Sequence, residues 1–321
     1  MHPRTLKRLA AAAFVLALIL AALMIRERAS PPVPTLLPKG AEPGKLSIRR
    51  PGDTEETVLV REGGAWRLKA PFSYPADAEV LRGLLEGLSK AAVSDVLSSN
   101  GGKHAAFQVN ESSAIRFKAF SLPTDSEPLL DILVGARGAD YDAFFFRRPG
   151  AADVREARGL GRDALDKEGG EWAERVVCAI DPSQARSVEL RTSAGLVSLL
   201  RKDGGWSFQG AALSTGAVAG KVEPLLTALA RLQADRVVPE KGIDPMLLRG
   251  LAAPEIRLRI RHARQGAPDA AVQTTEIDFG PKSPDFAHYA RLHGRQDVVF
   301  RLSAWRLDPF KLRPADLRPG K

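Results

Sequence analysis

Histidines are the first residues to test for metal binding or acid–base catalysis, and this sequence has few of them. The five histidines are scattered along the chain, at His2, His104, His262, His288 and His293. Only the last two are close in sequence, and their i, i+5 spacing directs the side chains to different faces of a helix or a strand. The spacing therefore favours histidines that lie on the surface and bind no metal ion.

Carboxylates form three close pairs that could bind a metal ion or share a proton: Glu55 with Glu56, Asp140 with Asp142, and Glu168 with Glu171. The aspartates of "GADYDAFFF" fit a hairpin turn better than a metal site, because aspartate is a common turn residue. The segment "GLGRDA" begins like a nucleotide-binding loop at Gly159 but lacks the third glycine of that motif.

Motifs for a nucleophile or a phosphate site are absent from the sequence: it has no G-x-S-x-G, no S-x-x-K with its supporting motifs and no Walker A loop. We therefore predict no catalytic, cofactor-binding or metal-binding residues and a protein that is not an enzyme. A hydrolase site assembled from distant residues is the weakest alternative, with His262 or His288 beside an aspartate.

The single cysteine, Cys178, rules out an intramolecular disulfide and a cysteine-based metal cluster. It stands in the apolar run "RVVCAID", which is typical of a small buried residue. The net charge is +9, but the basic residues are interleaved with acidic ones and form no dense stripe or zinc-finger spacing. We therefore predict a protein that needs no cofactor and binds no nucleic acid.

An uncharged apolar run, from Leu9 to Ile25, stands close to the N-terminus. At ~1.5 Å per residue, a helix of this run reaches roughly 25 Å, which is near the thickness of a bilayer core. Bulky residues followed by charges make its end a poor signal-peptidase site. We therefore predict an uncleaved anchor over 1–28 and a proline-rich spacer over 29–44. The basic residues before the run predict a cytoplasmic N-terminus and a single pass through the inner membrane, with the C-terminal modules in the periplasm or outside.

Two stretches of the chain resemble each other, "REGGAWRLKAPFSYPADAEVL" from Arg61 and "RKDGGWSFQGAALSTGAVAGKV" from Arg201. In each, an alternating strand meets a Gly-Gly pair, a Trp-led strand and a helix with an apolar stripe. Trp66 and Trp206 stand 140 residues apart (206 − 66). The pattern predicts an α+β fold of two tandem modules, over 45–168 and 172–318, each with a mainly antiparallel sheet and a helix on one face.

Local signals add detail to this prediction. The Gly-Gly pairs predict hairpin turns, and Pro75 with Asp77 predicts the start of the first helix. Pro224 predicts a bend or a restart in the second helix. Trp66 and Trp206 each stand between a turn and a helix, so we expect them to pack in the core rather than to bind a ligand.

The sequence resembles a family of bacterial membrane-anchored proteins known as domain of unknown function 4340. The resemblance rests on the N-terminal apolar segment, "GGAW" at Gly63, "GGW" at Gly204, "PAD" at Pro75, "RVV" at Arg236 and "GLAAP" at Gly250. It covers nearly all of the chain beyond the apolar segment and implies no catalytic residues. Members are commonly encoded beside ABC-transporter permeases and auxiliary proteins of the gliding-motility type, which implies an accessory subunit of an exporter.

Three functions remain in view. The first is a non-enzymatic, membrane-anchored envelope protein that acts as an accessory or interaction subunit of an ABC-type transport system, with permease or auxiliary subunits as partners. The second is a periplasmic module that binds an envelope glycan or lipid in a cleft between the two modules. The third and weakest is the hydrolase with a non-local site.

Overall fold

The computed structural model describes residues 34–202, 205–208, 215–263, 272–295 and 297–317. The predicted anchor over 1–28 and the first part of the predicted spacer lie outside the described residues. Within the described residues, no helix combines the length and the apolar character needed to span a bilayer. The described chain is α+β, with two large antiparallel sheets and a few helices packed on them.

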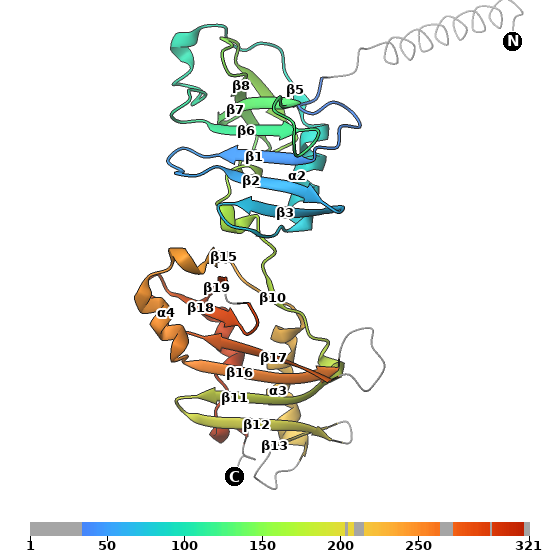
Figure 1. Ribbon diagram of the computed structural model, residues 1–321, viewed down its shortest axis with the longest axis vertical. Helices are drawn as coiled ribbons and strands as arrows, with labels where there is room; N and C mark the ends of the chain where they lie inside the picture. The colour runs from blue at the N-terminus through green and yellow to red at the C-terminus, as the bar shows by residue number, and fades with distance from the viewer. Residues whose placement is uncertain (1–33, 203–204, 209–214, 264–271, 296, 318–321) are drawn as a thin grey trace, which may run out of the picture.

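The first sheet has nine strands in the order β4-β3-β2-β1-β6-β7-β8-β9-β5 (Figure 1). The strands are β1 (Lys45–Arg49), β2 (Thr57–Glu62), β3 (Ala65–Ala70), β4 (Tyr74–Pro75), β5 (Ala92–Val93), β6 (Ile115–Phe120), β7 (Leu130–Arg137), β8 (Ala143–Arg147) and β9 (Arg155–Arg158). The helix α2 (Ala78–Lys90) connects β4 to β5 and so carries the chain from one edge of the sheet to the other. We call this sheet with α2 the first module.

The second sheet has eight strands in the order β13-β12-β11-β16-β17-β18-β19-β15. They are β11 (Ala185–Thr192), β12 (Gly195–Lys202), β13 (Gly205–Phe208), β15 (Arg236–Pro239), β16 (Ile256–Ala263), β17 (Val272–Phe279), β18 (Ala287–Leu292) and β19 (Val298–Ser303). With α3 (Thr215–Ala230) and α4 (Pro245–Ala252) this sheet forms the second module. A separate pair joins β10 (Val176–Cys178) to β14 (Leu232–Gln233).

Short 3₁₀ helices stand in the connections: η1 (Gly101–Lys103), η2 (Arg162–Ala164), η3 (Gly169–Glu171), η4 (Pro182–Gln184), η5 (Glu240–Gly242), η6 (Ala304–Phe310) and η7 (Pro314–Leu317).

The two sheets have the same strand order once β4 is set aside. β1–β3 correspond to β11–β13, β6–β9 to β16–β19, and β5 to β15 at the edge. The register repeats as well, because Arg61 pairs with Trp66 in the first sheet and Arg201 with Trp206 in the second. The alternation pattern missed β5 and β15, because strands of two and four residues are too short to show a period.

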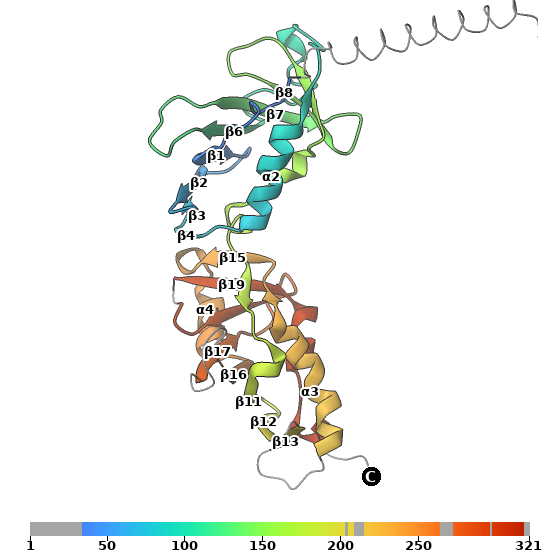
Figure 2. The ribbon, with the colours of Figure 1, turned by 90° about the vertical axis from the view of Figure 1, so that its right-hand side faces the viewer.

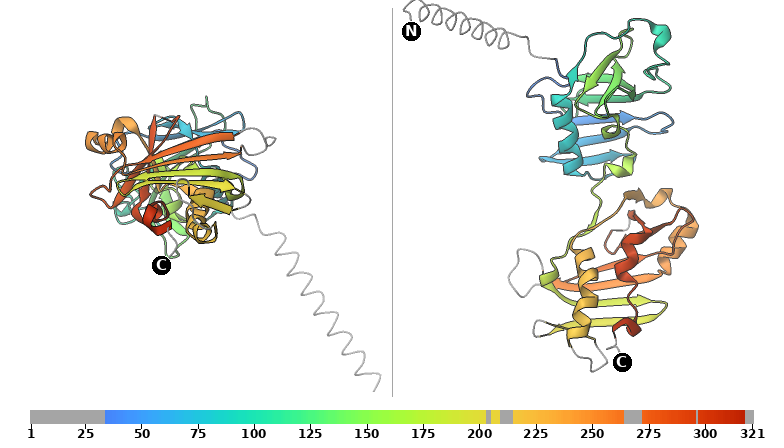
Figure 3. Two further views of the ribbon diagram at one scale, coloured as in Figure 1. Left: turned by 90° about the horizontal axis from the view of Figure 1, so that it is seen from below. Right: turned by 180° about the vertical axis from the view of Figure 1, so that it is seen from behind.

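The helices α2 and α3 lie on the same side of the molecule, each against one face of its sheet (Figures 2 and 3). Leu81, Leu84 and Leu88 of α2 recur at helical spacing and are buried. The helix begins as predicted, since the Asp77 carboxylate accepts hydrogen bonds from the first-turn backbone N–H groups at 3.1 and 3.2 Å. The second helix runs through Pro224 as one element, so it does not restart there.

The two tryptophans that the repeat aligns pack against the core. Trp206 is 6% exposed and Trp66 is half-buried, so the expected core packing is confirmed. Gly63 and Gly64 have φ values of 58° and 86°, which glycine adopts without steric strain. The first Gly-Gly pair therefore forms the predicted turn between β2 and β3.

One helix lies on the opposite face, which corrects the prediction of helices on one face only. Val298 and Phe300 of β19 belong to the main core, whereas Val299 between them joins Leu251 of α4 in a second, smaller cluster. Side chains alternate along a strand, so α4 covers the face that α3 leaves open. The physical reason is the connection: the chain must return from β15 at the edge to β16 near the centre of the sheet.

Candidate functional site

The structure places two of the histidines in the interior. His262 and His288 are 5% and 3% exposed, so the prediction of surface histidines is wrong for both. His262 Nε2 lies 3.0 Å from Thr275 Oγ1, and burial lowers the pKa of its imidazole. His288 Nδ1 lies 2.9 Å from the carbonyl oxygen of Gly280. The burial of His262 could have been predicted from the sequence of β16. The even-numbered residues of this strand are buried, and His262 continues that series.

A histidine–aspartate pair forms at His293 instead. His293 Nε2 lies 2.9 Å from Asp278 Oδ2, and Arg257 Nε donates to Oδ1 of the same carboxylate at 2.7 Å. Burial acts to raise the pKa of Asp278, but the hydrogen bonds from Arg257 and His293 outweigh it and hold this pKa below its ordinary value. Arg259 meets Glu276 beside this pair, so the contacts form an ion-pair ladder on the sheet face away from α3.

The carboxylate pairs singled out in the sequence do not gather into a ligand set. Within the described residues, no group of three or more His, Cys, Asp or Glu side chains is arranged to hold a metal ion. Asp140 and Asp142 lie in the turn between β7 and β8, where their backbone carbonyls accept hydrogen bonds. Glu171 accepts a hydrogen bond from the backbone N–H of Glu168 at 2.8 Å and so caps η3.

Cys178 packs against the core from β10. Burial raises the pKa of its thiol to about 12. A thiol with this pKa stays protonated at neutral pH, and the protonated form is a poor nucleophile. Cys178 is half-buried, and its packing against the core confirms the interpretation of a small packing residue.

The segment that connects the two modules is hydrogen-bonded to both of them and packs with both. Glu174 N–H donates to the carbonyl of Pro75 in the first module at 2.8 Å, and Ala234 N–H from the second module donates to the carbonyl of Arg175 at 2.8 Å. Trp172 between the modules is fully buried. The buried residues of both modules and of this connection form one hydrophobic cluster. The connection therefore resists bending in a way that a free linker does not.

Two glycines of η3 let the modules approach closely. A Cβ atom on Gly170 would lie 2.1 Å from the carbonyl oxygen of Val237, and one on Gly169 would lie 2.6 Å from Cδ of Pro71. Side chains do not tolerate such distances, so β15 and the β3–β4 connection can both touch η3 only because it starts with glycines. The sequence signal was "EGGEW" at the predicted boundary between modules.

A cleft of about 450 Å³ opens between the modules beside this contact. Its lining includes the β1–β2 turn and Phe72 from the first module, and β15 and Tyr289 from the second. Tyr74 and Arg295 also connect the modules, through a hydrogen bond and through the guanidinium group 5.3 Å from the ring centroid. The cleft therefore has a fixed shape and half-buried aromatic surface on both sides.

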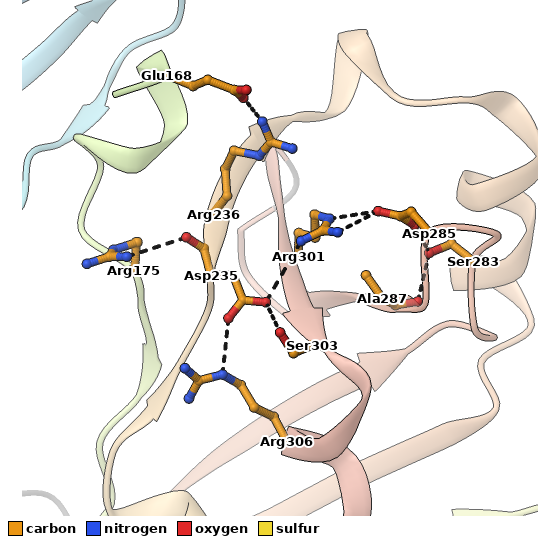
Figure 4. Close-up of polar contacts among 10 residues, drawn as sticks. All are labelled: Glu168, Arg175, Asp235, Arg236, Ser283, Asp285, Ala287, Arg301, Ser303 and Arg306. Atoms are coloured by element: carbon orange, nitrogen blue, oxygen red, sulfur yellow. Dashed lines mark hydrogen bonds and ion pairs between the residues drawn. The ribbon is translucent and has the colours of Figure 1, made fainter. Parts of the chain in front are cut away.

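The charged groups at the cleft are already paired with each other. Arg50 Nη2 lies 3.0 Å from Asp53 Oδ1 in the β1–β2 turn. Arg236 of β15 forms an ion pair with Glu168, which holds β15 to the end of the first module (Figure 4). A charged ligand would have to compete with these contacts, so the cleft is better suited to holding the modules together than to capturing an ion.

A polar network leads from this junction toward a turn of the second module (Figure 4). Asp235 accepts hydrogen bonds from Ser303 Oγ at 2.6 Å and from Arg306 Nε at 3.2 Å. Arg301 lies 3.9 Å from Asp235 and donates to Asp285 at 2.6 and 3.0 Å. The network therefore ties β15, β19 and the turn before β18 to one another.

That turn presents an exposed aromatic side chain. Phe286 is 72% exposed and has φ of 59°, in the left-handed region that bulky residues avoid. Such a conformation costs of order 1–3 kcal/mol and persists only where neighbouring contacts fix it. Here Ser283 Oγ donates to the carbonyl of Ala287 at 2.7 Å, and Asp285 is held by its ion pair. Lys282 Nζ lies 4.4 Å from the Phe286 ring centroid.

The turn lies against α4. A Cβ on Gly250 of α4 would meet Pro281 at 2.7 Å, so the helix and the turn are in close contact. Met246, one helical turn before Gly250, is 71% exposed. We call the exposed residues Met246, Lys282 and Phe286 the α4 surface. Sequence reasoning missed it, because an apolar residue type does not reveal that its side chain is exposed.

Comparison with known proteins identifies the family. No curated protein and no solved structure matches this chain. A family model described as domain of unknown function (DUF4340) matches residues 66–246, more than half of the chain. The match begins in β3 and ends in α4, so it includes the junction between the modules. The resemblance seen in the sequence motifs is confirmed, and the chain belongs to the DUF4340 family.

Proposed function

We propose that the protein is a non-enzymatic, membrane-anchored protein of the bacterial envelope that acts as an accessory or interaction subunit of an ABC-type transport system. It would consist of two tandem copies of one α+β module, held outside the inner membrane by a single N-terminal anchor. The apolar run from Leu9 to Ile25 and the shared strand order of the two sheets support this arrangement. The transport partner is proposed from the family resemblance.

The α4 surface is the observation that carries the proposal of an interaction role. Strain at an exposed side chain has no benefit for folding, and strained residues concentrate at functional positions. Phe286 is held outward by a turn that the Ser283 hydrogen bond fixes, and Met246 is a second exposed apolar side chain on the helix that this turn contacts. Exposed aromatic and methionine side chains are enriched at the centres of protein interfaces.

The cleft at the junction favours the second function, a binding module for an envelope glycan. Phe72 and Tyr289 offer aromatic surface on its two sides, and the hydrogen-bonded connection keeps its walls in place. Its charged groups are paired, which suits an uncharged polar ligand. Isothermal titration calorimetry with neutral envelope oligosaccharides tests this function. Binding that Phe72→Ala abolishes would support it. The absence of binding heat at millimolar oligosaccharide would reject it.

Site-specific photo-crosslinking in intact cells tests the interaction role. A benzophenone amino acid replaces Phe286 in the tagged full chain, and proteins joined to it after irradiation are identified by mass spectrometry. Permease or ATPase subunits among the products are the expected result. The control carries the same amino acid at Tyr141, which is 74% exposed in the first module. Identical products from both positions, or none from position 286, would contradict the proposal.

A further inference from the structure

Besides the cleft between the modules, the first module has a pocket of its own, of about 360 Å³, at the end where the described chain begins. Its floor is apolar and consists of Leu36, Val93, Leu130, Ile132 and Phe146. Apart from the half-buried Val93, these residues are at most 6% exposed and belong to the hydrophobic core. The floor of the pocket is therefore formed by core residues at this end of the module. The volume and the apolar floor match what small-molecule pockets in proteins have in common.

The walls of this pocket are fixed by backbone hydrogen bonds. The N–H of Val93 donates to the carbonyl of Pro34 at 2.8 Å, and the N–H of Leu36 donates to the carbonyl of Ala91 at 3.2 Å. Segment 34–36 is thereby attached to β5 and to the end of α2. The pocket therefore exists without a ligand to organise it, which lowers the entropic cost of binding.

Three arginines and one aspartate form the polar rim: Arg147, Arg148, Arg155 and Asp153. Arg147 is 8% exposed, and its Nε donates to the neutral carbonyl of Val109 at 2.6 Å. Its nearest carboxylate, Glu111, lies 3.8 Å away and is 60% exposed.

The other rim residues leave the positive charge in excess. Arg155 Nη1 donates to a second neutral carbonyl, that of Ser94, at 3.0 Å. Asp153 accepts a hydrogen bond from Ser99 at 2.7 Å. Arg148 is exposed, and its side chain has no partner among the residues that the structure describes. Arg148 and Arg155 against Asp153 therefore leave excess positive charge beside the apolar floor, whereas Arg147, next to Phe146 in β8, directs its guanidinium to Val109.

We propose that this pocket binds the acyl chain of an anionic amphiphile and holds its carboxylate or phosphate at Arg148 and Arg155. Guanidinium groups bind both anions through paired hydrogen bonds, and an apolar floor takes a hydrocarbon chain. A cationic amphiphile would be repelled by the rim, and a neutral one would leave it unused. This site is separate from the α4 surface and does not depend on the transport proposal.

The location of the pocket gives such ligands a route to it. Pro34, the described residue closest in sequence to the predicted anchor, lies in its wall. The end of the first module from which the anchor would extend is therefore the end that contains the pocket. A membrane lipid and a free fatty acid offer the same chemistry here, and the experiment separates the two sources.

Photoaffinity labelling of the full chain in phosphatidylcholine nanodiscs tests the proposal. One arm uses palmitate with a diazirine in its chain, and the other uses phosphatidylglycerol with a diazirine in one acyl chain. We expect labelled peptides that contain Val93, Leu130 to Ile132 or Phe146, and competition by the unlabelled compound. Labelling by palmitate alone assigns a free fatty acid, and labelling by phosphatidylglycerol assigns a membrane lipid. Labelling of these peptides by neither probe overturns the proposal.

Variants and a neutral probe separate binding in this pocket from adventitious labelling. Arg148→Glu with Arg155→Glu should reduce labelling at least tenfold, and so should replacing palmitate by its methyl ester. Arg191→Glu, the same charge change on an exposed arginine of β11, should leave labelling unchanged. If the double variant unfolds early in a thermal scan, the single Arg148→Glu replaces it. Equal labelling of the variant and the parent, or equal labelling by the methyl ester, would show that the arginines do not select the ligand.

Discussion

The two modules share a scaffold and differ in what is attached to it. Their strands follow the same order, and α2 and α3 cover the same face of their sheets. The connection from the edge strand back to the centre is irregular in the first module, with η1, whereas in the second it contains α4. The first module has the arginine-rimmed pocket, and the second has the α4 surface. The α4 surface includes Met246 of that connection, whereas the pocket is lined by segment 34–36 and the β8–β9 connection instead. Connections change at little cost to the sheet, so new contact surfaces arise in them.

The largest difference in stability between the modules should appear when their equivalent tryptophans are replaced by alanine. Trp206 is almost fully buried and Trp66 is half-buried. Trp206→Ala should lower the free energy of unfolding of the second module by about 3–5 kcal/mol, and Trp66→Ala should cost the first module about half as much. Native-state hydrogen exchange measures this, because it reports on each module separately.

Each tryptophan variant is the control for the other. Trp206→Ala should reduce protection in β11–β13 and leave β1–β3 protected, and Trp66→Ala should do the reverse. Equal losses in both modules from either variant would show that the modules unfold as one unit. The comparison of two modules that unfold independently would then fail.

A smaller effect should follow from the junction. Gly170→Ala places a Cβ against the backbone carbonyl of Val237. The clash can be relieved only if η3 or β15 shifts. We expect a loss of about 1–3 kcal/mol, as for other overpacked positions, with faster hydrogen exchange in β15 and in the connection. Small-angle scattering should show a broader distribution of distances between the modules.

Gly83→Ala is the matched control for this change. Gly83 is exposed in α2 and has no atom within 4 Å of an added Cβ. Alanine there should raise stability by up to about 1 kcal/mol, because it favours the helix over the unfolded chain. If Gly170→Ala leaves the exchange of β15 unchanged, the close approach at η3 is not what holds the modules together.

Features that depend on local pattern could be predicted from the sequence. The Gly-Gly turn, the cap at Asp77 and the packing of both tryptophans follow from residue type and spacing over a few positions. The family follows from the same motifs. Strands such as β6 and β16 show their period over six to eight residues, so their existence and antiparallel pairing were accessible as well.

Features that depend on contacts between distant residues could not be predicted. Glu168 and Arg236 are far apart in the chain, and their pairing depends on how β15 closes the second sheet. The exposure of Phe286 depends on the fold around its turn, and a Phe in that position would otherwise be expected in the core. The pocket combines charged residues from the end of β8, the β8–β9 connection and the start of β9 with apolar residues from three strands and segment 34–36, which no local pattern describes.

The smallest predicted effect is a difference in melting temperature between variants of two ion pairs, one on the sheet of each module. Asp278 of the second module is 7% exposed and is bound by Arg257 and His293, whereas Asp131 of the first is 23% exposed and is bound by Arg116. The pKa of Asp278 is lowered in the folded protein, so the ionised carboxylate stabilises the fold. This contribution is fully present above the unfolded pKa of about 3.9 and is lost as the pH falls through the lower folded value.

Asp278→Asn should therefore lower the melting temperature at pH 7 and have a smaller effect at pH 3, because pH 3 lies below the unfolded pKa of about 3.9, where the unfolded chain takes up a proton and the contribution of the ionised carboxylate falls. Asp131→Asn should have less effect at pH 7, because its ion pair is more exposed to solvent than that of Asp278 and contributes less. Thermal unfolding of the parent and both variants at the two pH values measures the differences. If Asp278→Asn lowers the melting temperature equally at pH 7 and pH 3, the side-chain packing at this position matters and its charge does not. The ladder on the second sheet would then be no stronger electrostatically than the Arg116–Asp131 pair on the first.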